Sequence, residues 1–165
     1  MTDPVTILGA GVMGLSIAAE LAERGVICSV HDPEGGPGTH GCSWWAGGML
    51  APYCEAESAD ELVIRLSLEA AGWWQRMGAD VHYSGSLVLA LARDHAELDR
   101  FARLTRNHEP LGAKDVAALE PELDTRFHRG LCFESEAHLT PRQALQALTA
   151  RLQERGVSIN RDVPS

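Results

Sequence analysis

The chain has 165 residues, of which 45% are hydrophobic and 22% are charged, so an ordinary globular domain with a core can form. Its formal net charge of −9 argues against nucleic acid or an anionic membrane as a partner, because both bind a basic face. The four cysteines have neither CxxC nor zinc spacing, which predicts free thiols, no metal site and a cytoplasmic protein.

The N-terminal stretch predicts a strand–helix–strand unit. Val5–Leu8 is a short apolar run that suits a buried parallel strand. A helix is expected from about Gly14 to Arg24, with polar side chains on one face and mostly small apolar side chains on the other. Gly25 ends this helix, and residues 26–30 suit a second strand that is reached by a right-handed crossover.

The turn of this unit carries the pattern GxGxxG over Gly9–Gly14. Gly9 permits a tight turn, Gly11 lets the backbone approach a pyrophosphate, and Gly14 lets the helix pack on the strand. The helix N-terminus favours phosphate through its dipole. Asp32, after the second strand, can accept hydrogen bonds from ribose hydroxyls and disfavours a 2′-phosphate. The alternative is a turn without a ligand, and the motif alone does not separate NAD from FAD.

The next segment favours FAD. Residues 33–41 predict a loop, and residues 41–52 are mostly small or apolar. Small side chains let a bulky ring system lie against the backbone, and Ser43 offers a hydroxyl to a second phosphate. A glycine-rich surface loop is the alternative interpretation of this run.

A single long helix is expected over residues 58–78. Ser58 and Glu61 have the spacing of a capping box at its start. Its apolar stripe consists of Leu62, Leu66, Ala70, Trp73 and Met77.

The middle of the chain contains both strand-like alternation and helix-like spacing of apolar residues. Residues 85–92 alternate as a strand does, and a helix is expected from Asp94 to about Arg106. A short helix is expected near 114–119, and a strand over 131–134.

The last stretch predicts one more helix and strand of the dinucleotide-binding sheet. Thr140 is the expected N-cap, Pro141 the first helical residue and Gln143 the capping-box partner of a helix that runs to about Arg155. Its apolar face consists of Leu145, Leu148 and Leu152. Gly156 ends this helix, and a strand is expected over 157–160. No further element continues the sheet, so we expect the chain to be a fragment.

Several stretches resemble the D-amino-acid-oxidase superfamily of FAD-dependent oxidoreductases, and the resemblance extends over essentially the whole chain. The run Ser43–Pro52 is similar to the small-residue segment of that superfamily, although Trp45 and Gly47 stand where alanine is more usual. Later stretches resemble its glycine-oxidase branch, which belongs to thiamine biosynthesis. These stretches are Ser84–Ala90, Leu119–Leu123, Gly130–Glu134 and Glu136–Arg142.

The resemblance implies a set of FAD contacts. The glycine motif, Gly9, Gly11 and Gly14, would bind the cofactor, and Val12 and Met13 within it would give backbone contacts to the pyrophosphate. Asp32 would hold the ribose. By the same resemblance, Gly41, Cys42 and Ser43 would lie along the phosphates, Gly47, Gly48 and Met49 against the isoalloxazine, and Val163 at the adenine.

The resemblance also implies a fold and a reaction. We expect an α/β protein in which a Rossmann-like FAD-binding domain of the GR2 type, residues 1–79 and 138–165, is interleaved with an incomplete α+β substrate domain, residues 80–137. The family reaction oxidises glycine or another small amine to the imine, while oxygen is reduced to hydrogen peroxide. Family members are longer than this chain, so we expect an inactive N-terminal portion that forms a homo-oligomer or associates with a missing C-terminal half.

No catalytic residue is identified, because the arginine that grips the substrate carboxylate in the family would follow residue 165. The chain's own candidates are simpler to interpret as solvated charges; these are Arg65, Arg93, Arg103 and Arg142. His138 is interpreted as a strand-end residue. A non-catalytic dinucleotide-binding fragment and an NAD-dependent Rossmann dehydrogenase remain the alternative functions.

Overall fold

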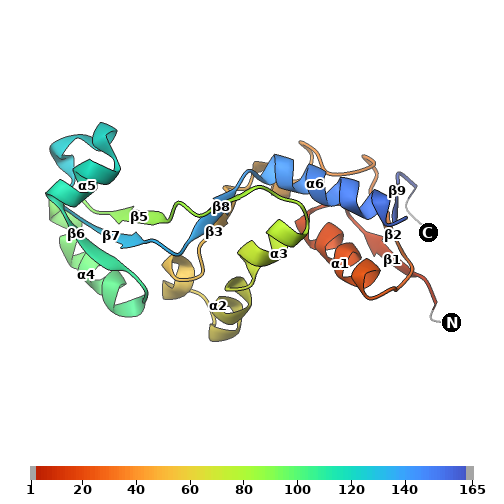
Figure 1. The fold of residues 1–165 in the computed structure, drawn as a ribbon, viewed down its shortest axis with the longest axis horizontal. Helices are drawn as coiled ribbons and strands as arrows, with labels where there is room; N and C mark the ends of the chain where they lie inside the picture. The colour runs from red at the N-terminus through yellow and green to blue at the C-terminus, as the bar shows by residue number, and fades with distance from the viewer. Residues whose placement is uncertain (1–2, 163–165) are drawn as a thin grey trace. The chain divides into compact units, whose positions relative to one another are not determined.

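The computed structural model describes residues 3–162, except for the side chains of residues 124 and 125, and it divides the chain into two compact units (Figure 1). Within the described range, the first unit contains residues 3–48, 72–80 and 139–162, and the second contains residues 49–71 and 81–138. The observed division differs from the expected boundaries mainly at 49–71. These residues fall in the second unit because the strand that begins at Met49 pairs there.

The first unit is built on a parallel sheet in the order β1-β2-β9. The strands are β1 (Val5–Leu8), β2 (Cys28–His31) and β9 (Ser158–Asn160). Two helices accompany them, α1 (Val12–Glu23) and α6 (Pro141–Glu154). The predicted strand–helix–strand unit is confirmed, with α1 beginning two residues earlier than expected, because Gly11 rather than a later residue is its N-cap.

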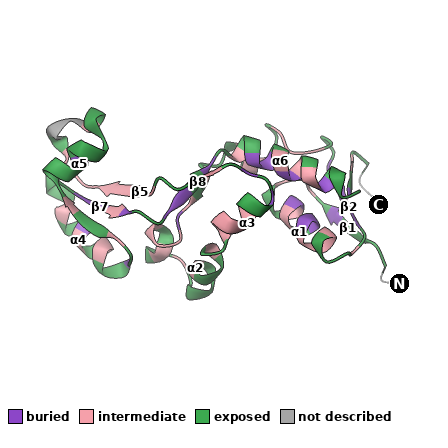
Figure 2. Ribbon diagram, viewed as in Figure 1, coloured by how far each residue is buried: buried purple, intermediate pink, exposed green. Residues whose placement is uncertain are grey.

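The core of the first unit lies on one face of this sheet. Ile7 of β1 pairs with Val30 of β2, and both are buried against the helices (Figure 2). The predicted apolar face of α6 is confirmed, since Leu145, Leu148 and Leu152 are all buried. The expected burial of β1 as a whole is wrong. Leu8 is 64% exposed, because alternate residues of a strand point to opposite faces and the core cluster lies on the face of Ile7.

The ends of the two long helices follow the glycines. Gly25 and Gly156 have φ angles of 72° and 79°, a left-handed conformation that ends a helix at little cost only for glycine. Thr140 is the N-cap of α6 and Pro141 its first residue, as predicted. The Thr140 side chain makes no capping hydrogen bond, so the predicted pairing with Gln143 does not form.

The single helix predicted over 58–78 is wrong. The chain forms a 3-10 turn η2 (Cys54–Glu57) and two short helices, α2 (Glu61–Ser67) and α3 (Ala70–Arg76). Ser58 closes η2 and Asp60 is the N-cap of α2, so the Ser58–Glu61 capping box is absent. The interruption lies close to the point where the chain passes from one unit to the other. Trp73 and Met77 pack in the core of the first unit, whereas Leu62 and Leu66 are exposed, so the expected stripe is not continuous.

The second unit contains two three-stranded sheets. One sheet has the order β5-β7-β6, formed by Ser86–Leu89, Arg129–Phe133 and Glu109–Gly112. The other has the order β3-β8-β4, formed by Met49–Leu50, Ala137–Leu139 and Val81–His82. The sequence predicted β5 and β7 but missed β3, β4, β6 and β8, which are short and owe their conformation to partners distant in sequence.

The two helices expected in the middle of the chain are confirmed, with ends displaced by one or two residues. They are α4 (His95–Leu104) and α5 (Ala113–Leu119). The 3-10 turns η3 (Ala92–Asp94) and η4 (Pro121–Arg126) were not predicted. Leu98 of α4 packs with Leu131 and Phe133 of β7 in a core of its own. Within residues 3–162, no helix has the length and apolar character needed to cross a membrane.

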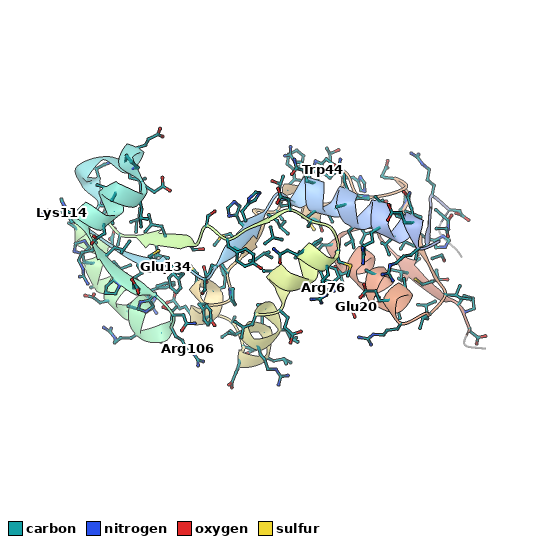
Figure 3. The ribbon with its side chains drawn as sticks, viewed as in Figure 1. Glu20, Trp44, Arg76, Arg106, Lys114 and Glu134 are labelled. Carbon is teal, nitrogen blue, oxygen red and sulfur yellow. The ribbon has the colours of Figure 1, made fainter. Side chains whose placement is uncertain are left out.

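A hydrogen bond fastens α3 to α1 inside the first unit. The indole Nε1 of Trp73 donates to Oε1 of Glu20 at 2.7 Å, and Arg24 donates to the other oxygen at 3.1 Å. Glu20 is labelled in Figure 3. The Trp73 hydrogen bond is the main reason that the pKa of the Glu20 carboxyl lies below its ordinary value. The ionised carboxylate is therefore the form that holds α3 in place.

We predict that Trp73→Phe lowers the free energy of unfolding at pH 7 by about 1 kcal/mol, because the indole donor is lost while most of the ring remains. A depressed carboxyl pKa contributes stability above the unfolded pKa and loses it as the pH falls through the folded pKa. The difference between wild type and variant should therefore shrink below about pH 4, near the ordinary pKa of a glutamate. Denaturant titrations at pH 7 and pH 3.5 measure it, and an undiminished difference at pH 3.5 would contradict this account.

Candidate dinucleotide-binding site

The glycine turn between β1 and α1 has the conformation that the motif requires. Gly9 has a φ angle of +96°, which favours glycine, and its N–H donates to the carbonyl of His31 at 2.8 Å. A Cβ atom on Gly14 would overlap the carbonyl oxygen of Gly9. The helix therefore passes closer to the turn than any other residue allows. The conformational roles predicted for Gly9 and Gly14 are observed, and their contact with a pyrophosphate stays a prediction.

Asp32 connects the end of β2 to this turn. Its side chain accepts a hydrogen bond from the N–H of Ala10 at 2.8 Å and another from the N–H of Glu34 at 3.0 Å. His40 Nε2 lies 3.5 Å from Oδ1 of the same carboxylate. Asp32 is only 7% exposed, yet each carboxylate oxygen can accept more than one hydrogen bond. The carboxylate is thus held in a fixed position with capacity left for a ribose hydroxyl.

Ser43 lies at the N-terminus of α1, although it follows that helix by a long stretch of sequence. Gly41 begins the 3-10 turn η1 (Cys42–Trp45), and the Ser43 hydroxyl oxygen accepts a hydrogen bond from the N–H of Val12 at 3.0 Å. A Cβ atom on Gly11 would lie 3.3 Å from the same oxygen. The structure therefore brings together Gly11, Val12 and Ser43, which the sequence analysis assigned to the phosphates. Cys42, beside Ser43, is exposed.

The small residues after η1 differ in what they permit. Gly48 has a φ angle of +78°, and a Cβ atom there would overlap the carbonyl oxygen of Leu139, whose N–H donates to the Gly48 carbonyl at 2.9 Å. A Cβ atom on Gly47 would have no other atom within 4 Å. Met49 begins β3 opposite His138 and is 54% exposed. Gly48 is thus required by the chain itself, whereas Gly47 and Met49 leave open surface.

Arg142 is exposed, as expected for a solvated charge, and it also contacts two aromatic rings. Its guanidinium carbon lies 5.9 Å from the ring centre of Trp44 and 5.0 Å from that of Trp45, within the range of a cation–π interaction. Trp44 is labelled in Figure 3. The indole N–H of Trp45 donates to the Thr39 carbonyl at 2.9 Å. These contacts hold η1, and with it Ser43, against the first turn of α6.

His138, expected at a strand end, lies inside β8.

Glu136 is a buried carboxylate that the sequence analysis did not single out. It has no exposed surface, and its Oε1 accepts hydrogen bonds from the N–H groups of Tyr53 and Cys54 at 3.0 and 2.7 Å. Among the described residues, its Oε2 has no partner. Burial and then the charges of Glu136 and Glu55 raise the pKa of the Cys54 thiol to about 11. Through its two backbone hydrogen bonds, Glu136 anchors the segment that follows β3.

Val163, the cysteines and possible metal ligands remain to be placed. Val163, predicted to touch the adenine, lies outside the described residues. All four cysteines are free thiols, as predicted, and the described residues contain no group of three or more His, Cys, Asp or Glu side chains that could hold a metal ion.

Comparison with known proteins supplies independent information. The family model described as FAD dependent oxidoreductase (DAO) matches residues 4–164. A putative thiamine biosynthesis oxidoreductase, ThiO, of Rhizobium etli is 48% identical over 151 residues, which are 91% of this chain and 46% of that protein. The crystal structure of glycine oxidase from Geobacillus kaustophilus, 23% identical, has a TM-score of 0.77 over 94% of this chain and 46% of that one.

The crystal structure of iminodiacetate oxidase from Chelativorans sp. BNC1 is similar to the same degree. It is 22% identical and has a TM-score of 0.78 over 96% of this chain and 47% of that one. The chain thus spans about half the length of these relatives. The structural likeness confirms the α/β fold that the sequence predicted.

We predict that Gly14→Ala destabilises the protein by about 1–3 kcal/mol, because the new methyl group forces the helix away from the Gly9 carbonyl. Alanine normally stabilises a helix by about 1 kcal/mol relative to glycine. A loss of stability in Gly14→Ala would therefore show that the close approach outweighs helix propensity. Gly47→Ala is the matched control, since its Cβ meets open space. Thermal unfolding of both variants measures the effect, and equal stability of the two would contradict the close approach.

We predict that iodoacetamide at pH 8 alkylates exposed Cys42 well before Cys54, because a thiol of pKa about 11 is ionised in only about one molecule in a thousand at that pH. Glu136→Gln keeps an acceptor for both N–H groups but removes the charge, so the Cys54 rate should rise. Burial and the charge of Glu134 (Figure 3) raise the pKa of Cys132 instead. Glu134→Gln is therefore the control that should accelerate Cys132 and not Cys54, as mass spectrometry of the labelled peptides would report.

Proposed function

The chain belongs to the DAO family of FAD-dependent oxidoreductases, and on that premise we propose that it binds FAD and forms part of an amine oxidase. The proposed reaction converts glycine or another small primary or secondary amine to the imine and reduces oxygen to hydrogen peroxide. The observation that carries the proposal is the convergence of Ser43 and the glycine turn at the N-terminus of α1, with the Asp32 carboxylate tied to the same turn.

The residues present fit the adenosine and pyrophosphate parts of FAD. The first N–H groups of a helix have no partner within the helix and attract phosphate oxygens. At the start of α1, Gly11 has no side chain to obstruct them. Met13 offers its N–H group, while the N–H of Val12 donates to Ser43 and so holds that hydroxyl beside the phosphates. The Ser43 hydroxyl, which accepts from Val12, can donate its own proton to a second phosphate oxygen. Asp32 accepts from the ribose hydroxyls.

The flavin part is assigned to the small residues that follow, at Gly47, Gly48 and Met49. When bound, FAD supplies the redox chemistry, taking a hydride from the amine and passing the electrons to oxygen. The open surface at Gly47 and the exposed side chain of Met49 allow a flat ring system to approach. The protein's part is to hold the two reactants in a fixed orientation. We assign no residue of this chain to the substrate.

A relative supports the choice of pathway. The Rhizobium etli relative carries the name of a thiamine biosynthesis oxidoreductase, which supports a role in forming the thiazole of thiamine. Four free cysteines suit a reducing compartment, so we place the reaction in the cytoplasm. An NAD-dependent dehydrogenase is disfavoured by the family match. A fragment that binds the dinucleotide without catalysis is distinguished by experiment.

We predict that the purified protein retains FAD after incubation and desalting, which gives the visible absorption bands of a bound flavin. Asp32→Asn should raise the dissociation constant for FAD about tenfold, because a charge-assisted hydrogen bond to the ribose becomes a neutral one. Asp3→Asn, at an exposed position, is the control and should bind FAD as the wild type does. Fluorescence titration of FAD measures all three dissociation constants.

Retention of NAD in place of FAD would refute the proposed cofactor. Bound FAD that is bleached by glycine in the absence of oxygen would support the oxidase, whereas bound FAD that no small amine bleaches would support the non-catalytic alternative for the chain by itself.

A further inference from the structure

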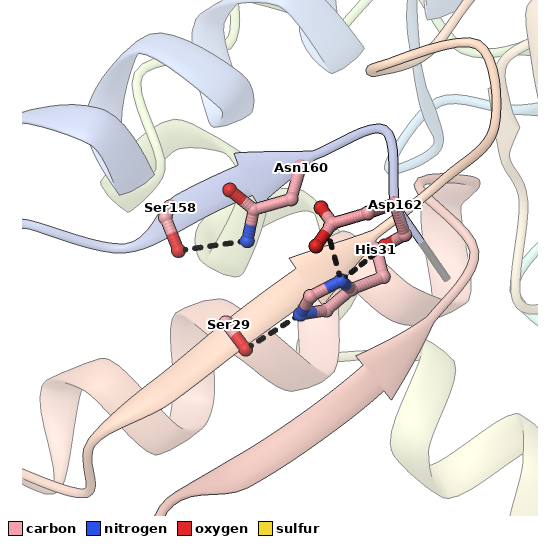
Figure 4. Close-up of polar contacts among 5 residues, drawn as sticks. All are labelled: Ser29, His31, Ser158, Asn160 and Asp162. Carbon is pink, nitrogen blue, oxygen red and sulfur yellow. Dashed lines mark hydrogen bonds and ion pairs between the residues drawn. The ribbon is translucent and has the colours of Figure 1, made fainter. Parts of the chain in front are cut away.

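A polar cluster centred on His31 lies on the face of the first sheet opposite the core (Figure 4). Ser29 and His31 project from β2, and the register places Ser158 and Asn160 of β9 beside them. His31 is only 9% exposed, although it lies on this face. Its burial indicates that the chain after β9 folds over the ring.

Both ring nitrogens of His31 have a defined partner. Nδ1 lies 2.5 Å from the backbone oxygen of Asp162, and Nε2 lies 3.0 Å from the hydroxyl of Ser29. A carbonyl oxygen can only accept, so Nδ1 carries the hydrogen, and in the neutral ring the Ser29 hydroxyl donates to Nε2. The Asp162 carboxylate is farther away, at 3.8 Å, and largely exposed. The principal contact therefore fixes the backbone of residue 162.

This contact continues the connection between β2 and β9 past the end of the sheet. The N–H of Asp32 donates to the carbonyl of Asn160 at 2.9 Å, which is the last backbone link between the two segments that the structure gives. Two residues later the His31 side chain holds Asp162. The side chain of Arg161 meanwhile lies against Gly35, where a built Cβ would be 2.9 Å from Arg161 Nε. The segment 161–162 is thus packed against the loop that begins at Asp32.

The position of this segment relates it to the cofactor. Parallel strands present their carboxyl ends at one edge of a sheet, and dinucleotides bind outside that edge. Here the carboxyl ends of β2 and β9 carry Asp32 and the segment 161–162. Because Asp32 is the residue assigned to the adenosine ribose, the adjoining segment is the part of the described chain placed to border the adenosine half.

We propose that His31 is a positioning residue for the adenosine half of FAD. The ring does not touch the cofactor; it holds the backbone at Asp162 in the position that borders the adenosine next to Asp32. This inference rests on the proposed function, because it presupposes FAD as the ligand. Its consequence is selective: His31 matters for FAD, which contains adenosine, and not for FMN, which lacks it.

The experiment compares the dissociation constants of FAD and FMN, measured by flavin fluorescence, for wild type and three variants. His31→Phe fills the space but loses the donor, and it should weaken FAD binding about tenfold while FMN binding changes by less than about twofold. His31→Asn places an amide N–H near the position of Nδ1, and it should keep FAD binding within about threefold of wild type. Ser29→Ala removes the partner of Nε2 only, and it should behave like His31→Asn.

Each outcome has a distinct meaning. A wild-type protein that binds no FAD would refute the proposed function, and this inference with it. FAD bound equally well by wild type and His31→Phe would overturn the inference alone. Equal losses of FAD and FMN affinity would show a general structural role and also overturn it. Nitrogen chemical shifts of the His31 ring provide a readout free of ligand: we expect hydrogen on Nδ1, and hydrogen on Nε2 alone would contradict the contact with Asp162.

Discussion

The carboxylate of Asp32 stands at the end of β2 and accepts a 2.8 Å hydrogen bond from the N–H of Ala10, inside the glycine turn. A buried, charge-assisted bond of this kind is stronger than one between neutral groups, so it fixes the turn relative to the strand. The glycine turn then fixes the N-terminus of α1, where the N–H of Val12 donates to the Ser43 hydroxyl. The candidate site thus depends on one carboxylate that serves the fold and remains able to accept a ligand.

The sequence predicted those parts of this arrangement that local chemistry decides. The positions of β1 and of the glycines at 9, 25 and 156 followed from apolar runs and from the need for positive φ angles. The small-residue run after Ser43 pointed to FAD, and the family match agrees. Gly48 was assigned to the flavin, and the structure adds that its close approach to the Leu139 carbonyl already excludes a side chain.

Contacts between distant parts of the chain decided the rest. His31 meets Asp162 across 131 residues, and Glu136 meets Cys54 across 82, so neither partner carried a signal that spacing or periodicity could reveal. The stripe over 58–78 failed for a related reason. Trp73 packs with α1 in the first unit while Leu62 and Leu66 remain exposed on α2, and only the division into two units makes that difference.

The proposed site is tested by titrating the ¹⁵N-labelled protein with FAD and following the backbone amide resonances. We predict that the amides of residues 10–14 and 41–43 shift first and together, because the helix N-terminus and the Ser43 turn form one phosphate-binding surface. Unchanged resonances in these two segments, with FAD bound or shifting amides elsewhere, would contradict the assignment of this site.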